Sequence, residues 1–189
     1  MRHGNNLISQ HKYFYKLIIA NNDYVNYIFF TNGIKWISVY EKMECSLGIS
    51  QNGEWVLKNK SKFYLLNQQK QFLFCANLIE SSYFEIKNYI EERFSNILQN
   101  EGINETELFP YFEIVEFVFK YFVDDYWFEL AWMWYMQFDI IEKRKLYDLL
   151  KYISCNKKIS QKNRQIVKKE IKEISRIKES LENMEYNGE

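Results

Sequence analysis

The sequence predicts an all-α protein, folded as a single-domain bundle of about six to eight helices. Breakers are rare, with one proline, Pro110, and six glycines in 189 residues. Apolar residues also recur at helical spacing over long stretches, and a hydrophobic fraction of 47% is enough for one sizeable core. The predicted domain, residues 1–189, has an N-terminal helical half (1–100), acidic aromatic central helices (105–142) and basic C-terminal helices (143–184).

The N-terminal region begins with a predicted helix over residues 7–20, which the polar residues 21–23 end. Residues 24–40 allow two structures. Their β-branched and aromatic residues surround Asn32 and Gly33, a dipeptide that favours the tight turn of a small β-hairpin. The same residues fit two helices joined at Gly33, and we favour the helical alternative.

Residues 48–53 predict a loop, and residues 54–80 predict a mainly helical segment. Ser82 and Glu85 have the spacing of a capping box, in which each side chain satisfies an exposed backbone amide of the other. This box opens a predicted amphipathic helix, which ends at the glycine-containing stretch 100–104.

The central region contains the most apolar stretch of the chain. Residues 111–122 predict one helix, and Asp124 or Asp125 caps a second helix over residues 126–138. The second helix is apolar nearly all the way round, so we expect it to be buried on most sides as the central element of the fold. Core packing is accordingly the first interpretation of its aromatic residues.

Two further helices are predicted in the C-terminal region. Leucines at helical spacing indicate a helix over residues 143–153, and a polar loop follows at residues 154–159. Ser160 then caps a long last helix that alternates apolar residues with many lysines.

Charge divides the second half of this neutral chain into two blocks. Residues 101–142 contain ten acidic residues and one basic residue, a net charge of −9. Residues 143–178 contain thirteen basic and three acidic residues, a net charge of +10. An acidic block rich in aromatic residues is better suited to binding a basic partner than to catalysis.

A catalytic or metal site needs several polar groups at suitable spacing, and the sequence contains no such set. His3 and His11 are the only histidines, and Cys45, Cys75 and Cys155 are too widely spaced to suggest a zinc site. Nucleophile-elbow and phosphate-loop motifs are absent. We therefore expect no enzymatic activity, no cofactor and no bound metal.

The same cysteines indicate reduced thiols, as in a cytosolic protein. Residues 1–10 are polar and do not resemble a secretory signal. The longest apolar stretch, residues 126–138, is shorter than the roughly 20 residues that span a bilayer. We expect a cytoplasmic protein without a membrane partner.

Six carboxylates are the candidate partner-binding residues: Glu113, Glu116, Asp125, Glu129, Asp139 and Glu142. The first two are one helical turn apart, and the next two are aligned by their four-residue spacing. The last two are predicted near a helix C-terminus, where negative charge is unfavourable and so points to function. Because this block repels phosphate, nucleic acid is not the expected partner.

The basic block has three interpretations. It is the solvated face of an amphipathic helix, a set of charges that balances the acidic block within the fold, or a phosphate-binding stripe. The stripe would comprise Lys157, Lys158, Lys162, Arg164, Lys168, Lys169 and Lys172.

Two stretches of the second half resemble small bacterial immunity proteins. The first is a Tyr-Trp-x-Glu-Leu-Ala-x-x-Trp pattern at residues 126–134, and the second is a Lys-x-Ile-Ser-Gln-Lys-x-Arg pattern at residues 157–164. Such proteins neutralise the toxic C-terminal domains of contact-dependent growth inhibition and Rhs-type polymorphic toxin systems. The resemblance covers residues 126–171 and implies a mostly helical cytoplasmic protein that has no activity of its own.

The charge pattern fits this implied function. Nuclease toxins have basic active sites, which an acidic surface can reach quickly through electrostatic steering and aromatic residues can then hold. The expected function is immunity to a cognate toxin domain, a nuclease in particular, by occlusion of its active site. The alternative is a nucleic-acid-binding or regulatory helical module that uses the basic C-terminal helix. The toxin's identity and the oligomeric state stay open.

Overall fold

The computed structural model describes residues 2–186, and the side chains of residues 2–7, 22, 25 and 178–186 are left aside. The chain groups into two compact units, Met1–Glu113 and Ile114–Glu189, and each is described by itself. The boundary falls within helix α3 (Tyr111–Tyr121). That the whole chain folds as one domain stays a prediction.

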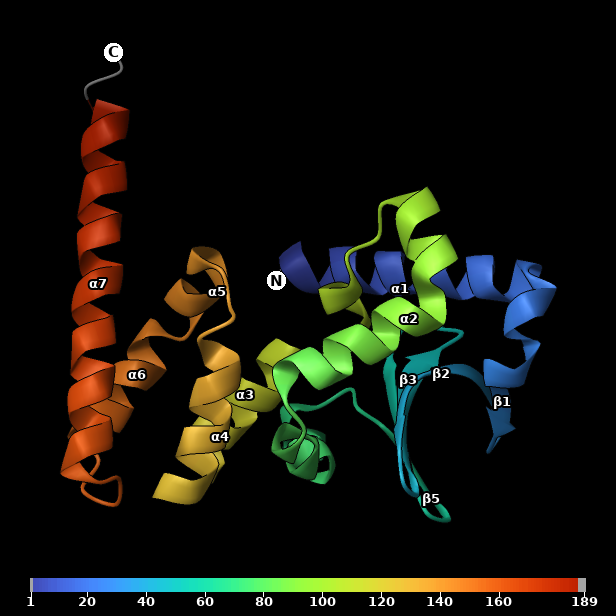
Figure 1. The fold of residues 1–189 in the computed structure, drawn as a ribbon, viewed down its shortest axis with the longest axis horizontal. Coiled ribbons are helices and arrows are strands. Elements are labelled where there is room, and N and C mark those ends of the chain that lie inside the picture. Colours follow the sequence, from blue (N-terminus) through green and yellow to red (C-terminus); the bar gives the residue numbers. More distant parts are fainter. Residues whose placement is uncertain (1, 187–189) are drawn as a thin grey trace. The chain divides into compact units, whose positions relative to one another are not determined.

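The first unit combines a sheet with helices (Figure 1). Its elements before α3 are α1 (Arg2–Ala20), the 3-10 segment η1 (Asn22–Tyr27), β1 (Ile28–Thr31), β2 (Ile34–Lys42), β3 (Cys45–Ser50), β4 (Trp55–Asn59), β5 (Lys62–Leu65), the 3-10 segment η2 (Gln69–Glu80), α2 (Tyr83–Glu101) and the 3-10 segment η3 (Glu105–Leu108). Each strand pairs antiparallel with the next one along the chain, and the sheet is curled.

The all-α prediction is therefore wrong. In residues 24–40 the hairpin alternative is correct for β1 and β2, whose turn places Asn32 and Gly33 at φ angles of 50° and 77°. Positive φ at both positions is what the type I′ turn of a hairpin requires. The predicted helix over residues 54–80 is also wrong, since this segment forms β4, β5 and then η2. Pairing with neighbouring strands decided the structure of these β-branched and aromatic residues.

Strand β2 lies at the centre of the first unit's core. Its residues Trp36–Tyr40 are buried without a break, which means that both faces of the strand are covered. Helices α1 and α2 both contact β2. They also contact each other through Phe14 and Phe94, whose rings lie edge to face with centroids 5.3 Å apart.

The predicted ends of α2 are confirmed. The Ser82 hydroxyl accepts a hydrogen bond from the Glu85 backbone amide at 3.0 Å, and Gly102 ends the helix in the left-handed conformation.

The second unit is helical. It contains the rest of α3, α4 (Asp125–Tyr135), α5 (Ile140–Lys145), α6 (Tyr147–Cys155) and α7 (Gln161–Tyr186), and α6 packs along α7 (Figure 1). Asp124 caps α4 and Ser160 caps α7, as predicted. The helix predicted over residues 143–153 is instead divided between α5 and α6, which meet at Leu146.

Helix α4 is less buried than its composition suggests. Phe128, Trp134 and Tyr135 pack in the core, whereas Tyr126 and Met133 are 56% and 58% exposed. The expectation that this helix is buried on most sides is thus wrong, because only one side packs in the core. Neither α4 nor any other described helix is long and apolar enough to cross a bilayer.

Candidate functional site

Helix α3 places its two predicted site residues on one side. Glu113 and Glu116 are one turn apart and half-buried, while Ile114, Val115 and Val118 point into the core. Glu113 takes part in a further interaction. Glu116 forms no hydrogen bond or ion pair with any residue that the structure describes. Its carboxylate therefore remains available to a partner.

Asp125 and Glu129 also share one side of their helix, as predicted, and both bind the amide of Asn163. The amide nitrogen Nδ2 of Asn163 donates to Asp125 Oδ1 at 2.8 Å and to Glu129 Oε1 at 3.2 Å. Asp125 Oδ1 also accepts the Ser160 backbone amide at 2.9 Å. Asn163 is buried, so these bonds hold the start of α7 against α4. The two carboxylates have a structural role that the sequence did not reveal.

The charge of Asp125 survives this arrangement. Hydrogen bonds, first from the Ser160 backbone amide and then from Asn163, hold the pKa of Asp125 below its ordinary value, and Arg164 adds a weaker effect in the same direction. The groups that donate to Asp125 and Glu129 are neutral amides rather than lysines. The pair therefore still contributes negative charge to this side of the second unit.

Asp139 and Glu142 do not lie where the sequence predicted. They form a capping box at the N-terminus of α5, in which Asp139 Oδ1 accepts the Glu142 amide at 2.8 Å and Glu142 Oε2 accepts the Asp139 amide at 3.3 Å. Negative charge is favourable at a helix N-terminus. Burial raises the pKa of Glu142. The unfavourable placement that suggested function is absent, because the helix begins here instead of ending.

We predict that Asp125→Ala lowers the stability of the fold by about 1–2 kcal/mol, because the Ser160 amide and the buried Asn163 amide lose an acceptor. Urea unfolding at neutral pH measures the loss. Glu116→Ala is the control, since this side chain has no such bond among the described residues. An equal loss in both variants would contradict the structural role of Asp125.

Exposed apolar side chains lie on the same two helices as these carboxylates. Tyr126 and Met133 are two turns apart on one side of α4, and Met136 and Ile141 follow at its end and on α5. Trp132, by contrast, stacks on Phe128 and Tyr135 with ring centroids 5.4 and 4.9 Å away. Tyr126, Met133 and Met136 are thus the most exposed large side chains of α4 and its C-cap, whereas Trp127 and Trp132 are half-buried.

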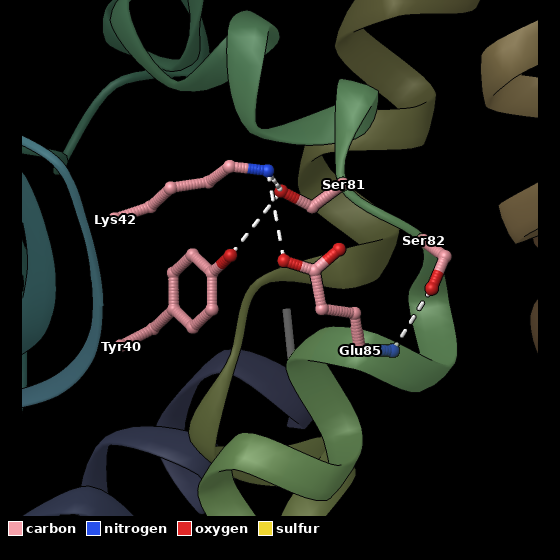
Figure 2. Close-up of polar contacts among 5 residues, drawn as sticks. All are labelled: Tyr40, Lys42, Ser81, Ser82 and Glu85. Atoms are coloured by element: carbon pink, nitrogen blue, oxygen red, sulfur yellow. Dashed lines mark hydrogen bonds and ion pairs between the residues drawn. The ribbon is translucent and has the colours of Figure 1, made fainter.

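A second polar cluster, which the sequence did not predict, lies in the first unit (Figure 2). The buried Ser81 hydroxyl accepts a hydrogen bond from Lys42 Nζ at 2.7 Å and lies 3.2 Å from the Tyr40 hydroxyl. Lys42 Nζ also forms an ion pair with Glu85 at 3.6 Å. Figure 2 shows why the predicted capping box is only half formed: the Glu85 side chain turns to Lys42 instead of returning to Ser82.

This cluster fastens β2 to the start of α2. A lysine beside a serine can act as a base only when the amine is neutral, whereas Lys42 is paired here with a carboxylate and donates to Ser81. Burial raises the pKa of Tyr40 as well, which keeps its hydroxyl protonated. The four groups therefore act as donors and acceptors that hold two elements together. About forty residues separate their two halves in sequence, so no local spacing could have predicted them.

The described part of the chain contains no group of three or more His, Cys, Asp and Glu side chains that could hold a metal ion. The sequence matches no protein-family model. Comparisons with curated proteins and with solved structures likewise found no similar protein.

Proposed function

We propose that the chain is an immunity protein, which binds a cognate bacterial toxin domain through carboxylates of α3 and α4 and exposed apolar side chains of α4. The proposal builds on the resemblance of residues 126–171 to immunity proteins. The protein would inhibit the toxin through binding alone. The basic surface of a nuclease domain is the kind of partner that this side fits, because phosphate-binding sites are positively charged.

One observation carries the proposal: α4 and its C-cap expose Tyr126, Met133 and Met136 on the helix that holds Asp125 and Glu129, two carboxylates that form no ion pair with a lysine among the described residues. Exposed large apolar side chains of this kind commonly mark protein-binding surfaces. Methionine and tyrosine adapt to a partner and bury much area on contact. The carboxylates would bring a basic partner in, and the apolar side chains would slow its release.

The six predicted residues would contribute to partner binding in different ways. Asp125, Glu129, Asp139 and Glu142 all serve the fold through hydrogen bonds. They would add to the electrostatic field rather than form close contacts. Glu116, one turn from Glu113, is the carboxylate on which direct contact would depend most.

The test first requires a candidate toxin domain, and a large secreted protein encoded immediately upstream of this chain's gene would supply one. Co-expression of the chain should restore the growth of cells that make this domain, and the purified proteins should bind with an association rate that falls as salt rises. The proposal fails if the chain neither protects the cells nor binds the domain.

Reversing the charges of α3 should weaken this complex. We predict that Glu113→Lys with Glu116→Lys lowers the association rate about tenfold, because steering by this side is lost. Stopped-flow binding measures the rate, and circular dichroism verifies the fold. The matched control, Asp23→Lys with Glu92→Lys, reverses two exposed charges of the first unit. Equal rates for both variants would exclude the α3 carboxylates from the interface.

A further inference from the structure

Helix α7 presents a basic surface to solvent. The residues Lys162, Lys169, Lys172 and Arg176 are all exposed, and their spacing of seven, three and four places them on one side of the helix. Lys168 flanks them and is exposed as well. The opposite side is buried through Asn163, Val167 and Ile174. We call this exposed set, extended by Lys157 and Lys158 in the preceding loop, the α7 basic face.

Intramolecular ion pairs leave nearly all of this charge uncompensated. The one acidic residue exposed between 161 and 177 is Glu173, which pairs with Arg176 at 2.7 Å. The lysine side chains of the α7 basic face form no ion pair or hydrogen bond with any described residue. Glu170 pairs instead with Lys143, which belongs to α5, at 3.2 Å. Among the described residues, the lysine side chains of this face therefore form no direct ion pair with the acidic block.

The dimensions of the face suit a nucleic-acid backbone. Fourteen residues separate Lys162 from Arg176, a rise of about 21 Å along the helix axis. One strand of duplex DNA places a phosphate about every 3.4 Å along its axis, so the face spans about six phosphates. The two lysines of the loop, Lys157 and Lys158, precede the helix and extend the basic face beyond its first turn.

Other polyanions fit the face less well. A basic amphipathic helix binds membranes by inserting its apolar side, but the apolar side of α7 is buried against its own unit, including α6. A protein partner would need large apolar or aromatic anchors, and Ile177 is the single one exposed on the described part of α7. Phosphate contacts need only cations on long side chains. The described side chains of α7 also include no aromatic residue for the stacking that single strands require.

We propose that the α7 basic face binds the phosphate backbone of double-stranded nucleic acid without sequence specificity. The helical part of this face lies opposite Asn163, the residue of α7 that binds Asp125 and Glu129 of α4. The sequence-based expectation against nucleic acid concerned the acidic block and does not apply to this helix. Binding here stands or falls independently of the immunity function.

The test measures fluorescence anisotropy of a labelled duplex DNA of scrambled sequence, in a salt series, with the full chain. The variant replaces Lys162, Lys168, Lys169 and Lys172 with glutamine, which preserves helix propensity. The wild-type protein should bind with a steep salt dependence, and the variant should reduce the slope of log K against log salt by about three to four. The control variant replaces four exposed lysines of the first unit with glutamine: Lys12, Lys16, Lys62 and Lys70. It should keep the wild-type slope.

A second variant guards against damage to α7 itself. Lys157→Gln with Lys158→Gln lies in the loop and should reduce the slope by about two. A second scrambled duplex should bind equally well. The proposal is overturned if the wild-type protein does not bind duplex, if the control loses as much slope as the α7 variant, or if anionic phosphatidylglycerol vesicles or polyglutamate compete for the face while duplex does not.

Discussion

Gly48→Ala is expected to cause the largest loss of stability of any single methyl addition to the sheet. Gly48 lies in β3, where it pairs with Ser38 on one side and Val56 on the other. A β-carbon at this position would collide with the Ile37 carbonyl oxygen and lie 2.7 Å from Cε3 of Trp36. Trp36 is fully buried. The backbone of β2 would have to shift.

We expect Gly48→Ala to lower the free energy of unfolding by about 3 kcal/mol or more. This is a large share of the roughly 5–15 kcal/mol that stabilises a domain. Urea unfolding followed by far-ultraviolet circular dichroism measures the loss. Every other residue type at position 48 would meet the same collision, since any side chain has a β-carbon.

Gly33→Ala is the matched control. No atom lies within 4 Å of a β-carbon at this position, but the φ angle of 77° is unfavourable for alanine. Its cost should be about 1 kcal/mol, from backbone conformation alone. If Gly48→Ala costs no more than Gly33→Ala, the close approach of β3 to β2 at this point is not tight.

Local sequence predicted the helices well because their ends are set by local hydrogen bonds. Ser82, Asp124 and Ser160 each cap the helix that the sequence assigned to them, and Gly102 ends α2. Each of these contacts joins residues that are close in sequence. The spacing of residues in the sequence is therefore sufficient to predict where these helices begin and end.

The sheet was missed because its strands and turns lack their usual local patterns. Five consecutive buried residues in β2 hide the alternation that marks a half-buried strand. The turns after β2 and β4 place Met43 and Lys60 at φ angles of 53° and 54°. Neither residue type commonly adopts positive φ, so neither marks a turn. Asn32 with Gly33 and Asn52 with Gly53 did give turn patterns. The first supported the hairpin alternative, and the second lies in the predicted loop over residues 48–53, of which residues 48–50 belong to β3.

The candidate surface was predicted in part for the same reason. Four-residue spacing correctly aligned Asp125 with Glu129, but their shared partner, Asn163, is more than thirty residues away in sequence. No local rule connects them. For Asp139, a small error in the position of a helix end reversed the sign of the dipole argument. Contacts that are distant in sequence decided which carboxylates serve the fold.

His11 carries the second large prediction, because it joins three elements in the core of the first unit. This residue of α1 is 1% exposed, with Nδ1 2.9 Å from the Gly53 carbonyl oxygen and Nε2 2.9 Å from the Glu107 carbonyl oxygen. Trp55 packs against the ring with centroids 4.4 Å apart. We expect His11→Leu to lower the free energy of unfolding by about 2–4 kcal/mol at pH 8, since the carbonyl that accepts from the neutral imidazole loses its buried donor and the contact of the ring with Trp55 is lost.

The pKa of His11 is set by two opposing effects, burial and the surrounding carbonyl and carboxylate oxygens. A neutral imidazole donates to one carbonyl only, whereas the cation would donate to both, and the Glu107 carboxylate also favours the cation. Burial opposes the cation more strongly and lowers the pKa of His11 below its ordinary 6.5. The folded state then binds this proton less tightly than the unfolded chain does. The contribution of His11 to stability is therefore complete above about pH 6.5 and is lost as the pH falls towards the lower folded-state pKa.

Two measurements separate these effects. Proton NMR of the imidazole, in a His3→Gln background that leaves a single histidine, should give a pKa below 6.5 in the folded protein. Urea unfolding between pH 8 and pH 5 should show a fall in stability below pH 6.5 that is absent from His11→Gln, whose amide donates to a carbonyl but does not titrate. A pKa above 6.5 would show that the two carbonyls and Glu107 outweigh burial. Stability would then be lost as the pH rises instead, because the folded state would hold the proton more tightly than the unfolded chain.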